Sequence, residues 1–301
     1  MSKALKVIKA VTVTDAILTA TDIAETDHAA WSGATTYALG DRCILTSTHK
    51  IYESLQAGNL NKSPLTETLF WVEVSPTNRW KAFDLSTTVA TTFSTSAYYE
   101  LTPATAVNAV GILNAVGVLT IRIRLTDPSF GVVYDQTATL NSIPSESSWY
   151  AWFFEERTQA TQFIATDLPT YPNAVLRIDM TATTASVGVI TFGSQKSVGM
   201  AVQHGVRLGL QDYSRKERND FGDTVLVQRA YASRVSLDVV VDNRYLDSTY
   251  TTLTDLRATP CLWLVSDRYT SLTLFGFYNS FEIGIQYADY SECSIDLEGL
   301  T

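Results

Sequence analysis

The strongest constraint on the fold is a recurring two-residue alternation of apolar and polar side chains. In one run the apolar positions are Leu119, Ile121, Ile123 and Leu125, and Thr and Arg residues separate them. A second run, residues 235–241, has the same period. Successive side chains of a strand point to opposite faces, so this period predicts half-buried β-strands. The abundance of Thr and Val, with 15 Tyr and 6 Trp, also favours strands. We therefore expect a mainly β protein.

Turn residues divide the chain into four parts. A length of 301 residues suggests two or three domains, at ~100–200 residues each. Residues 1–30 contain neither Pro nor Gly and predict an extended arm. Residues 31–76 predict a small sheet of about three strands with long loops. Residues 77–197 predict an antiparallel β-sandwich, and residues 198–301 predict an α+β unit with one helix on an antiparallel sheet.

Two local predictions are the most specific. Near 243–257, residues Leu246, Tyr250, Leu253 and Leu256 recur at spacings of four and three. This spacing places them on one face of a helix, which Asp242 or Asn243 can cap. The aromatic run Trp149–Glu155, WYAWFFE, predicts a central strand of the sandwich.

Composition excludes several classes of function. The net charge of −9 does not favour a nucleic-acid partner, because such proteins usually carry a basic patch. No apolar run reaches 18 residues, so we expect no membrane insertion, and Lys6 and Lys9 argue against a signal peptide. Cys43, Cys261 and Cys293 lie far apart and predict buried free thiols, which fits folding in a reducing compartment.

The common catalytic motifs are absent from the sequence. It contains no phosphate-binding loop, no dinucleotide fingerprint, no His-Glu-x-x-His and no Gly-x-Ser-x-Gly. His28, His49 and His204 are isolated, and His49 is expected to be solvated in a polar turn. Glu155 and Glu156 end the aromatic run, but adjacent strand residues face opposite ways and cannot act together on a sugar. We therefore expect no catalytic residue, no metal and no cofactor.

The charged run from Ser214 to Thr224, SRKERNDFGDT, mixes both signs of charge around one glycine. It predicts an exposed loop or the tip of a hairpin. A surface with both signs also suits a contact that fixes the register of a neighbouring subunit. The sequence leaves a solvated loop and such a contact as alternatives.

Aromatic residues are dense in the segment 31–76 and have two interpretations. Exposed Trp and Tyr rings can stack on sugar rings, whereas a unit of about 45 residues also needs aromatics for its own core. Tyr52 and Trp71 lie in apolar strand-like runs, which favours the core. Trp31 and Tyr37 lie in a polar stretch before the Gly40-Asp41 turn, and there the two interpretations are balanced.

This segment resembles the small chitin-binding type of carbohydrate-binding module (the 5/12 kind). The matching pattern is Trp31-x5-Tyr37-x2-Gly40-Asp41, followed by His49-x-x-Tyr52-x-x-Leu55, Pro64 and Trp71. Such modules bind polysaccharide without cleaving it. The resemblance makes Trp31, Tyr37, Tyr52 and Trp71 the candidate carbohydrate-binding residues.

Over nearly its full length the chain resembles a family of tail proteins of tailed bacteriophages and prophages. The matching stretches include KVIKAVTVTDAIL, WSGATTYALGD, DYSRKERNDFGDTVLVQRAYASR, FGFYNSFEI and CSIDLEGL. The resemblance implies a structural subunit of the virion tail tip or baseplate, assembled in the bacterial cytoplasm. Its implied partners are other tail or baseplate proteins and further copies of itself, with host cell-surface polysaccharide as a target of the module.

Two other functions remain open at this stage. The first is a tail-associated enzyme that degrades polysaccharide and carries an appended sugar-binding module, which requires a cleft with two spaced carboxylates. The second is a free secreted lectin, against which the absence of a signal peptide and of paired cysteines argues.

Overall fold

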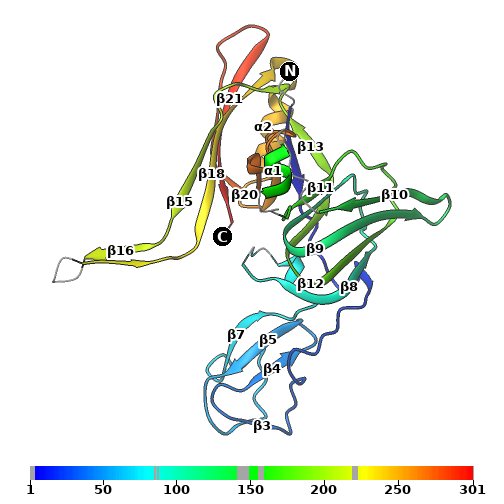
Figure 1. Ribbon diagram of the computed structural model, residues 1–301, viewed down its shortest axis with the longest axis vertical. Coiled ribbons are helices and arrows are strands. Elements are labelled where there is room, and N and C mark those ends of the chain that lie inside the picture. Colours follow the sequence, from blue (N-terminus) through cyan, green and yellow to red (C-terminus); the bar gives the residue numbers. More distant parts are fainter. Residues whose placement is uncertain are drawn as a thin grey trace.

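The structure is a computed structural model that describes residues 4–84, 86, 88–140, 149–154, 159–218 and 223–300. It is mainly β, its sheets are antiparallel, and one α-helix covers part of the C-terminal sheet, as the sequence predicts. Figure 1 shows two large sheets in the upper part of the molecule, the small N-terminal sheet at the bottom, and a long ribbon that extends to one side.

A six-stranded sheet forms the central body. Its order is β10-β9-β12-β8-β2, with β11 also paired to β9. The strands are β2 (Leu18–Thr21), β8 (Thr91–Leu101), β9 (Ala109–Asp127), β10 (Gly131–Thr139), β11 (Phe163–Ala165) and β12 (Val175–Gly193). One face buries a continuous core that includes Tyr99, Ile121 and Ile178. The other face is exposed along the second half of β9, which explains the alternation seen in the sequence.

One residue of that alternating run departs from the pattern. Leu119 is 41% exposed, whereas Ile121, Ile123 and Leu125 are buried. The register shifts here, because Thr120 pairs with Thr181 and Val118 pairs with Ala182. Leu119 therefore has no partner opposite it in β12, and the irregularity turns its side chain away from the core.

The C-terminal part forms an eight-stranded sheet. Its order is β13-β1-β19-β20-β21-β18-β14, with β15 also paired to β18. The strands are β1 (Leu5–Lys9), β13 (Gln195–Val198), β14 (Ala201–Val202), β15 (Arg207–Asp212), β18 (Tyr231–Asp242), β19 (Cys261–Leu264), β20 (Thr273–Gly284) and β21 (Tyr290–Gly299). Only Gly199 and Met200 separate β13 from β14, the two ends of this order, so the sheet must curl until its ends approach. Gly199 has φ +68°, and a Cβ atom there would lie 2.6 Å from the carbonyl oxygen of Val240.

The predicted C-terminal helix is confirmed. A 3-10 turn, η2 (Asn243–Tyr245), leads into α2 (Leu246–Asp255), and the side chain of Asp242 accepts a hydrogen bond from the Arg244 backbone N–H. Leu253 and Leu256 are buried against the concave face of the eight-stranded sheet, together with Trp263.

The two large sheets pack against each other over a limited area. Ile8 of β1, Leu262 and Leu264 of β19 and Phe275 of β20 meet Ala109, Leu113 and Val189 of the six-stranded sheet. This contact explains why the first residues of β9 are buried on both faces. On the face of β20 that points away from the C-terminal core, the contact covers only the end near Phe275. The rest of that face, which includes Ser280 and Glu282, is exposed to solvent.

The segment 31–76 forms the small sheet that the sequence predicts. Its three strands are β4 (Arg42–Leu45), β5 (Lys50–Ser54) and β7 (Trp71–Pro76), and β3 (Thr36–Tyr37) pairs separately with β6 (Asn59–Leu60). We call this segment the module. A 3-10 turn, η1 (Lys81–Phe83), follows it.

Residues 1–30, predicted as an extended arm, contribute β1 to the C-terminal sheet and β2 to the central sheet of the same chain. One prediction needs correction. The aromatic run is not a strand: Trp149–Phe154 forms a short helix, α1, and Glu155 and Glu156 lie outside the described residues. Every position from Trp149 to Phe154 is apolar or aromatic, so the run carries no period that could distinguish a strand from a helix.

Candidate functional site

Three of the four candidate sugar-binding residues form the core of the module. Tyr37, Tyr52 and Trp71 are 6%, 7% and 3% exposed and pack together with Cys43. The rings of Tyr37 and Trp71 meet edge to face with their centroids 5.0 Å apart. The Trp71 indole N–H donates to the Lys62 carbonyl oxygen at 2.8 Å. Rings held inside a core in this way cannot offer a flat face to a sugar.

Trp31 is the remaining candidate and lies at the margin of this core. Its side chain is half-buried and packs against the core cluster, and its backbone N–H donates to the Ile44 carbonyl oxygen at 2.8 Å. Of the four motif residues, Trp31 therefore keeps the most ring surface available to a ligand.

A polar cluster joins the module to the rest of the chain, and it involves His49. The Nδ1 atom of His49 lies 2.9 Å from Glu25, its Nε2 atom lies 2.8 Å from Asp15, and its ring stacks on Trp80 at 4.4 Å. Glu25 also accepts a hydrogen bond from the Thr77 hydroxyl at 2.9 Å. His49 is therefore a structural link and not the solvated turn residue that the sequence suggests.

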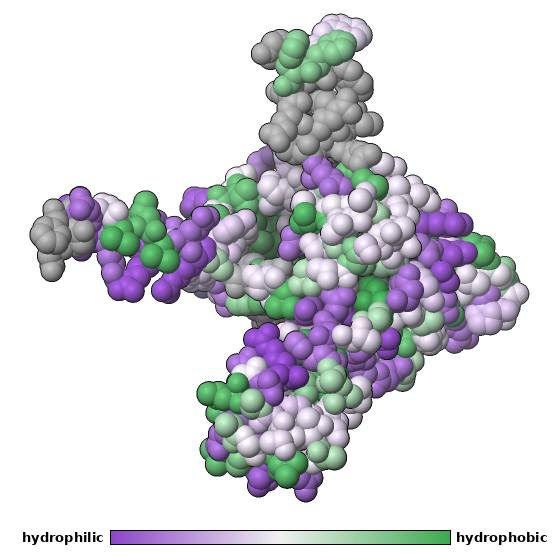
Figure 2. Space-filling model, turned by 60° about the horizontal axis from the view of Figure 1, so that its bottom comes forward, coloured by the Kyte–Doolittle hydropathy of each residue, from purple (hydrophilic) through white to green (hydrophobic). Residues whose placement is uncertain are grey.

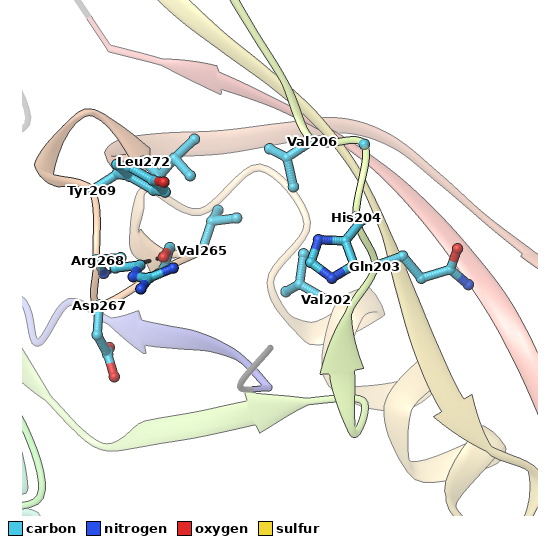
Figure 3. Close-up of a pocket in the computed structure, with 11 residues that line it drawn as sticks. Val202, Gln203, His204, Val206, Val265, Asp267, Arg268, Tyr269 and Leu272 are labelled. Atoms are coloured by element: carbon cyan, nitrogen blue, oxygen red, sulfur yellow. Dashed lines mark hydrogen bonds between the residues drawn. The ribbon is translucent and has the colours of Figure 1, made fainter. Parts of the chain in front are cut away.

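A cavity with a volume of about 640 Å³ lies on the C-terminal sheet. It separates the loop that follows β14 from the loop that joins β19 to β20, which contains a 3-10 turn, η3 (Thr270–Leu272). Figure 3 shows Val202 and Val206 on one side and Val265 and Leu272 on the other. Among the described residues that line it, Asp267 is the one carboxylate, so the cavity does not contain the carboxylate pair that glycoside hydrolysis uses.

In the described part of the chain, no group of three or more His, Cys, Asp or Glu side chains has an arrangement that could hold a metal ion. Within the same residues, no helix is long and apolar enough to cross a membrane.

The three cysteines are free and completely buried, as predicted. Burial raises the pKa of the Cys43 and Cys293 thiols to about 11 and that of Cys261 to about 12. At pH 8 about one in a thousand of the Cys43 and Cys293 thiols, and about one in ten thousand of the Cys261 thiols, is then ionised. The thiolate is the reactive form. We expect an aromatic disulfide reagent to modify none of them in the native protein and all three after denaturation. Rapid labelling of any cysteine in the native protein would contradict this burial.

The most prominent surface feature is the ribbon that leaves the C-terminal sheet. Strands β15 and β18 extend beyond the sheet and continue into the hairpin of β16 (Arg215–Arg218) and β17 (Thr224–Val227). We call residues 207–231 the arm. The described residues of the charged run, 214–218, 223 and 224, therefore belong to a hairpin whose two strands are exposed. Figures 1 and 2 show the arm projecting well clear of the body.

The described strands of the arm expose apolar side chains. Seven large ones among the arm's described residues are at least 44% exposed: Leu208, Leu210, Tyr213, Val225, Leu226, Val227 and Tyr231. Figure 2 shows hydrophobic and hydrophilic residues side by side on the projecting part. Exposed apolar side chains gathered on a thin projection are typical of an interaction site.

Comparisons of the chain with protein-family models, with curated proteins and with solved structures give no match.

Proposed function

We propose that this protein is a structural component of a bacteriophage tail tip or baseplate, located in the virion and assembled in the host cytoplasm. It self-associates through the arm and contacts other tail or baseplate proteins. The module is displayed outward and aids attachment to host-surface polysaccharide. The resemblance of the sequence to tail proteins supports the location in the virion, and the exposed arm supports self-association.

The arm is the observation that carries this proposal. It contributes almost nothing to the core of its own chain, because every described residue of β16 and β17 is exposed. Exposed Leu, Val and Tyr side chains cost free energy in water, at about 25 cal/mol for each Å² of apolar surface that could be buried. An assembly partner that covers the arm would recover this free energy.

The position of the module allows it to remain exposed on the surface of an assembly. The module and the arm project from different parts of the molecule in Figure 1. An interface made through the arm would therefore leave the module open to solvent. In an oligomer, several copies of a weak sugar site would act together through avidity.

The mass of the purified chain in solution tests the proposal. We expect light scattering coupled to gel filtration to give an integral multiple of 33.2 kDa that persists on dilution to micromolar concentration. A monomer across the whole concentration range would contradict self-association. Release of oligosaccharide from host polysaccharide by the protein would contradict a purely structural role.

A further inference from the structure

The outer face of the C-terminal sheet carries an unusual concentration of carboxylates. Strands β18, β21 and β20 lie side by side, and their residues alternate between the buried concave face and the outer face. The register places Ser236, Asp296 and Ser280 in one outer row and Asp238, Ser294 and Glu282 in the next. Glu292 follows in the third row, between Val240 and Gly284.

These four carboxylates have no cationic partner among the described residues. Asp238 accepts a hydrogen bond from the Ser294 hydroxyl, Asp296 accepts one from Ser280, and Glu292 accepts one from Gln203. Asp238, Glu282 and Asp296 are exposed. We call Asp238, Glu282, Glu292 and Asp296 the acidic face. At one end it borders exposed apolar side chains at the turn between β20 and β21, namely Ile285, Tyr287 and Tyr290.

The arm has the opposite charge balance. The arm, residues 207–231, contains five Lys and Arg and four Asp and Glu, whereas the rest of the chain contains seventeen and twenty-seven. The arm is therefore positive on a chain whose net charge is −9. Within it, Arg215 pairs with Glu217 and Lys216 pairs with Asp212. Arg218 and Arg229 are exposed and have no ion-pair partner in the described part of the chain.

One face of the hairpin combines positive charge with an apolar centre. Lys216 lies opposite Leu226, and Arg218 lies opposite Thr224, so these four side chains share a face. Leu226 is 69% exposed at its centre. The acidic face with its neighbouring Ile285 and Tyr287 has the complementary features, carboxylates beside exposed apolar groups. Complementary charges of this kind select the partner and fix its register.

From this complementarity we infer that the arm of one copy docks on the acidic face of a second copy, an inference that rests on the proposed self-association. The arm cannot reach the acidic face of its own chain, because β18 runs without interruption from the arm into that sheet. Arm and acidic face are different surfaces, so the contact is head-to-tail, and its repetition closes into a ring or continues as a filament.

Charge reversal on each side tests this pairing. The arm variant carries Arg218→Glu and Arg229→Glu, and the face variant carries Glu282→Lys and Asp296→Lys. Each variant alone is expected to dissociate at a concentration at least about tenfold higher than that of the unmodified chain. A control with Lys196→Glu and Arg257→Glu makes the same change of net charge as the arm variant, at exposed sites elsewhere, and is expected to assemble normally.

Mixing the two variants gives the decisive readout. In an equimolar mixture, reversed arms meet reversed faces and unmodified arms meet unmodified faces, so assembly is expected to return with both chains in equal amounts. Recovery of this kind excludes misfolding as the cause of the separate losses. If the unmodified chain assembles but neither variant weakens it, or if the mixture does not recover, the pairing is wrong while self-association stands. If the unmodified chain is itself a monomer, the proposed function fails.

Discussion

Replacing the arm with a tight turn is expected to convert the assembly into monomers. Asp212 and Tyr231 are direct partners in the register of β15 and β18, so an Asn-Gly turn can replace residues 213–230 without disturbing the sheet. The deleted segment includes most of the exposed apolar side chains of the arm. Light scattering is expected to give 33.2 kDa less the deleted residues, at concentrations where the unmodified chain is assembled.

The stability of the shortened chain separates loss of contact from loss of fold. The residues of β16 and β17 are exposed, so the thermal midpoint of the isolated chain is expected to change little. A milder pair of variants provides a matched comparison. Leu226→Ser in the arm is expected to weaken assembly, whereas Phe130→Ser in the turn between β9 and β10 is expected to leave it unchanged, although Leu226 and Phe130 are 69% and 73% exposed. Assembly of the shortened chain at the original mass would exclude the arm as the interface.

Trp71→Ala is expected to unfold the module rather than to remove a sugar contact. The indole is 3% exposed and packs on Tyr37 and Tyr52. Removing a buried Trp costs about 3–5 kcal/mol, and the Lys62 carbonyl oxygen loses its hydrogen-bond donor as well. A cost of this size is large for a sheet of three short strands. Limited proteolysis is expected to cut within residues 31–76 while the two large sheets remain resistant and the protein stays assembled.

Unlike Trp71→Ala, Trp31→Ala is expected to remove a sugar contact without unfolding the module. Trp31 is half-buried at the margin of the same core, so the module is expected to keep its protease resistance. Retention of this variant on immobilised host polysaccharide is expected to fall. If Trp71→Ala instead keeps the module folded and abolishes retention, Trp71 acts as a stacking surface and the assignment of the core is wrong.

The sequence predicts the class of fold because its signals are local. Alternation of apolar and polar residues identifies the strands, and spacings of three and four residues identify α2. The length of each strand is harder to predict from the sequence. The runs 176–180 and 187–192 look like separate strands, but they belong to the single strand β12, which bends through irregular pairings between Thr181 and Thr184. The bend is stabilised by neighbouring strands, which a local pattern does not contain.

The candidate interfaces were predictable only in part. The composition of the charged run 214–224 predicts an exposed loop or the tip of a hairpin. The acidic face is different, because Asp238, Glu282 and Asp296 come from three strands and become neighbours only through the sheet register. The burial of Tyr37 also depends on tertiary structure. A polar stretch surrounds it in the sequence, yet in the fold β6 and Trp71 enclose it.

Electron microscopy of the unmodified chain, free and in tail tips, tests the central claim most directly. We expect a ring or a filament in which the arm of each copy crosses to the acidic face of the next and the modules point outward. Single, separate molecules with free arms, together with absence of the protein from tail tips, would contradict it.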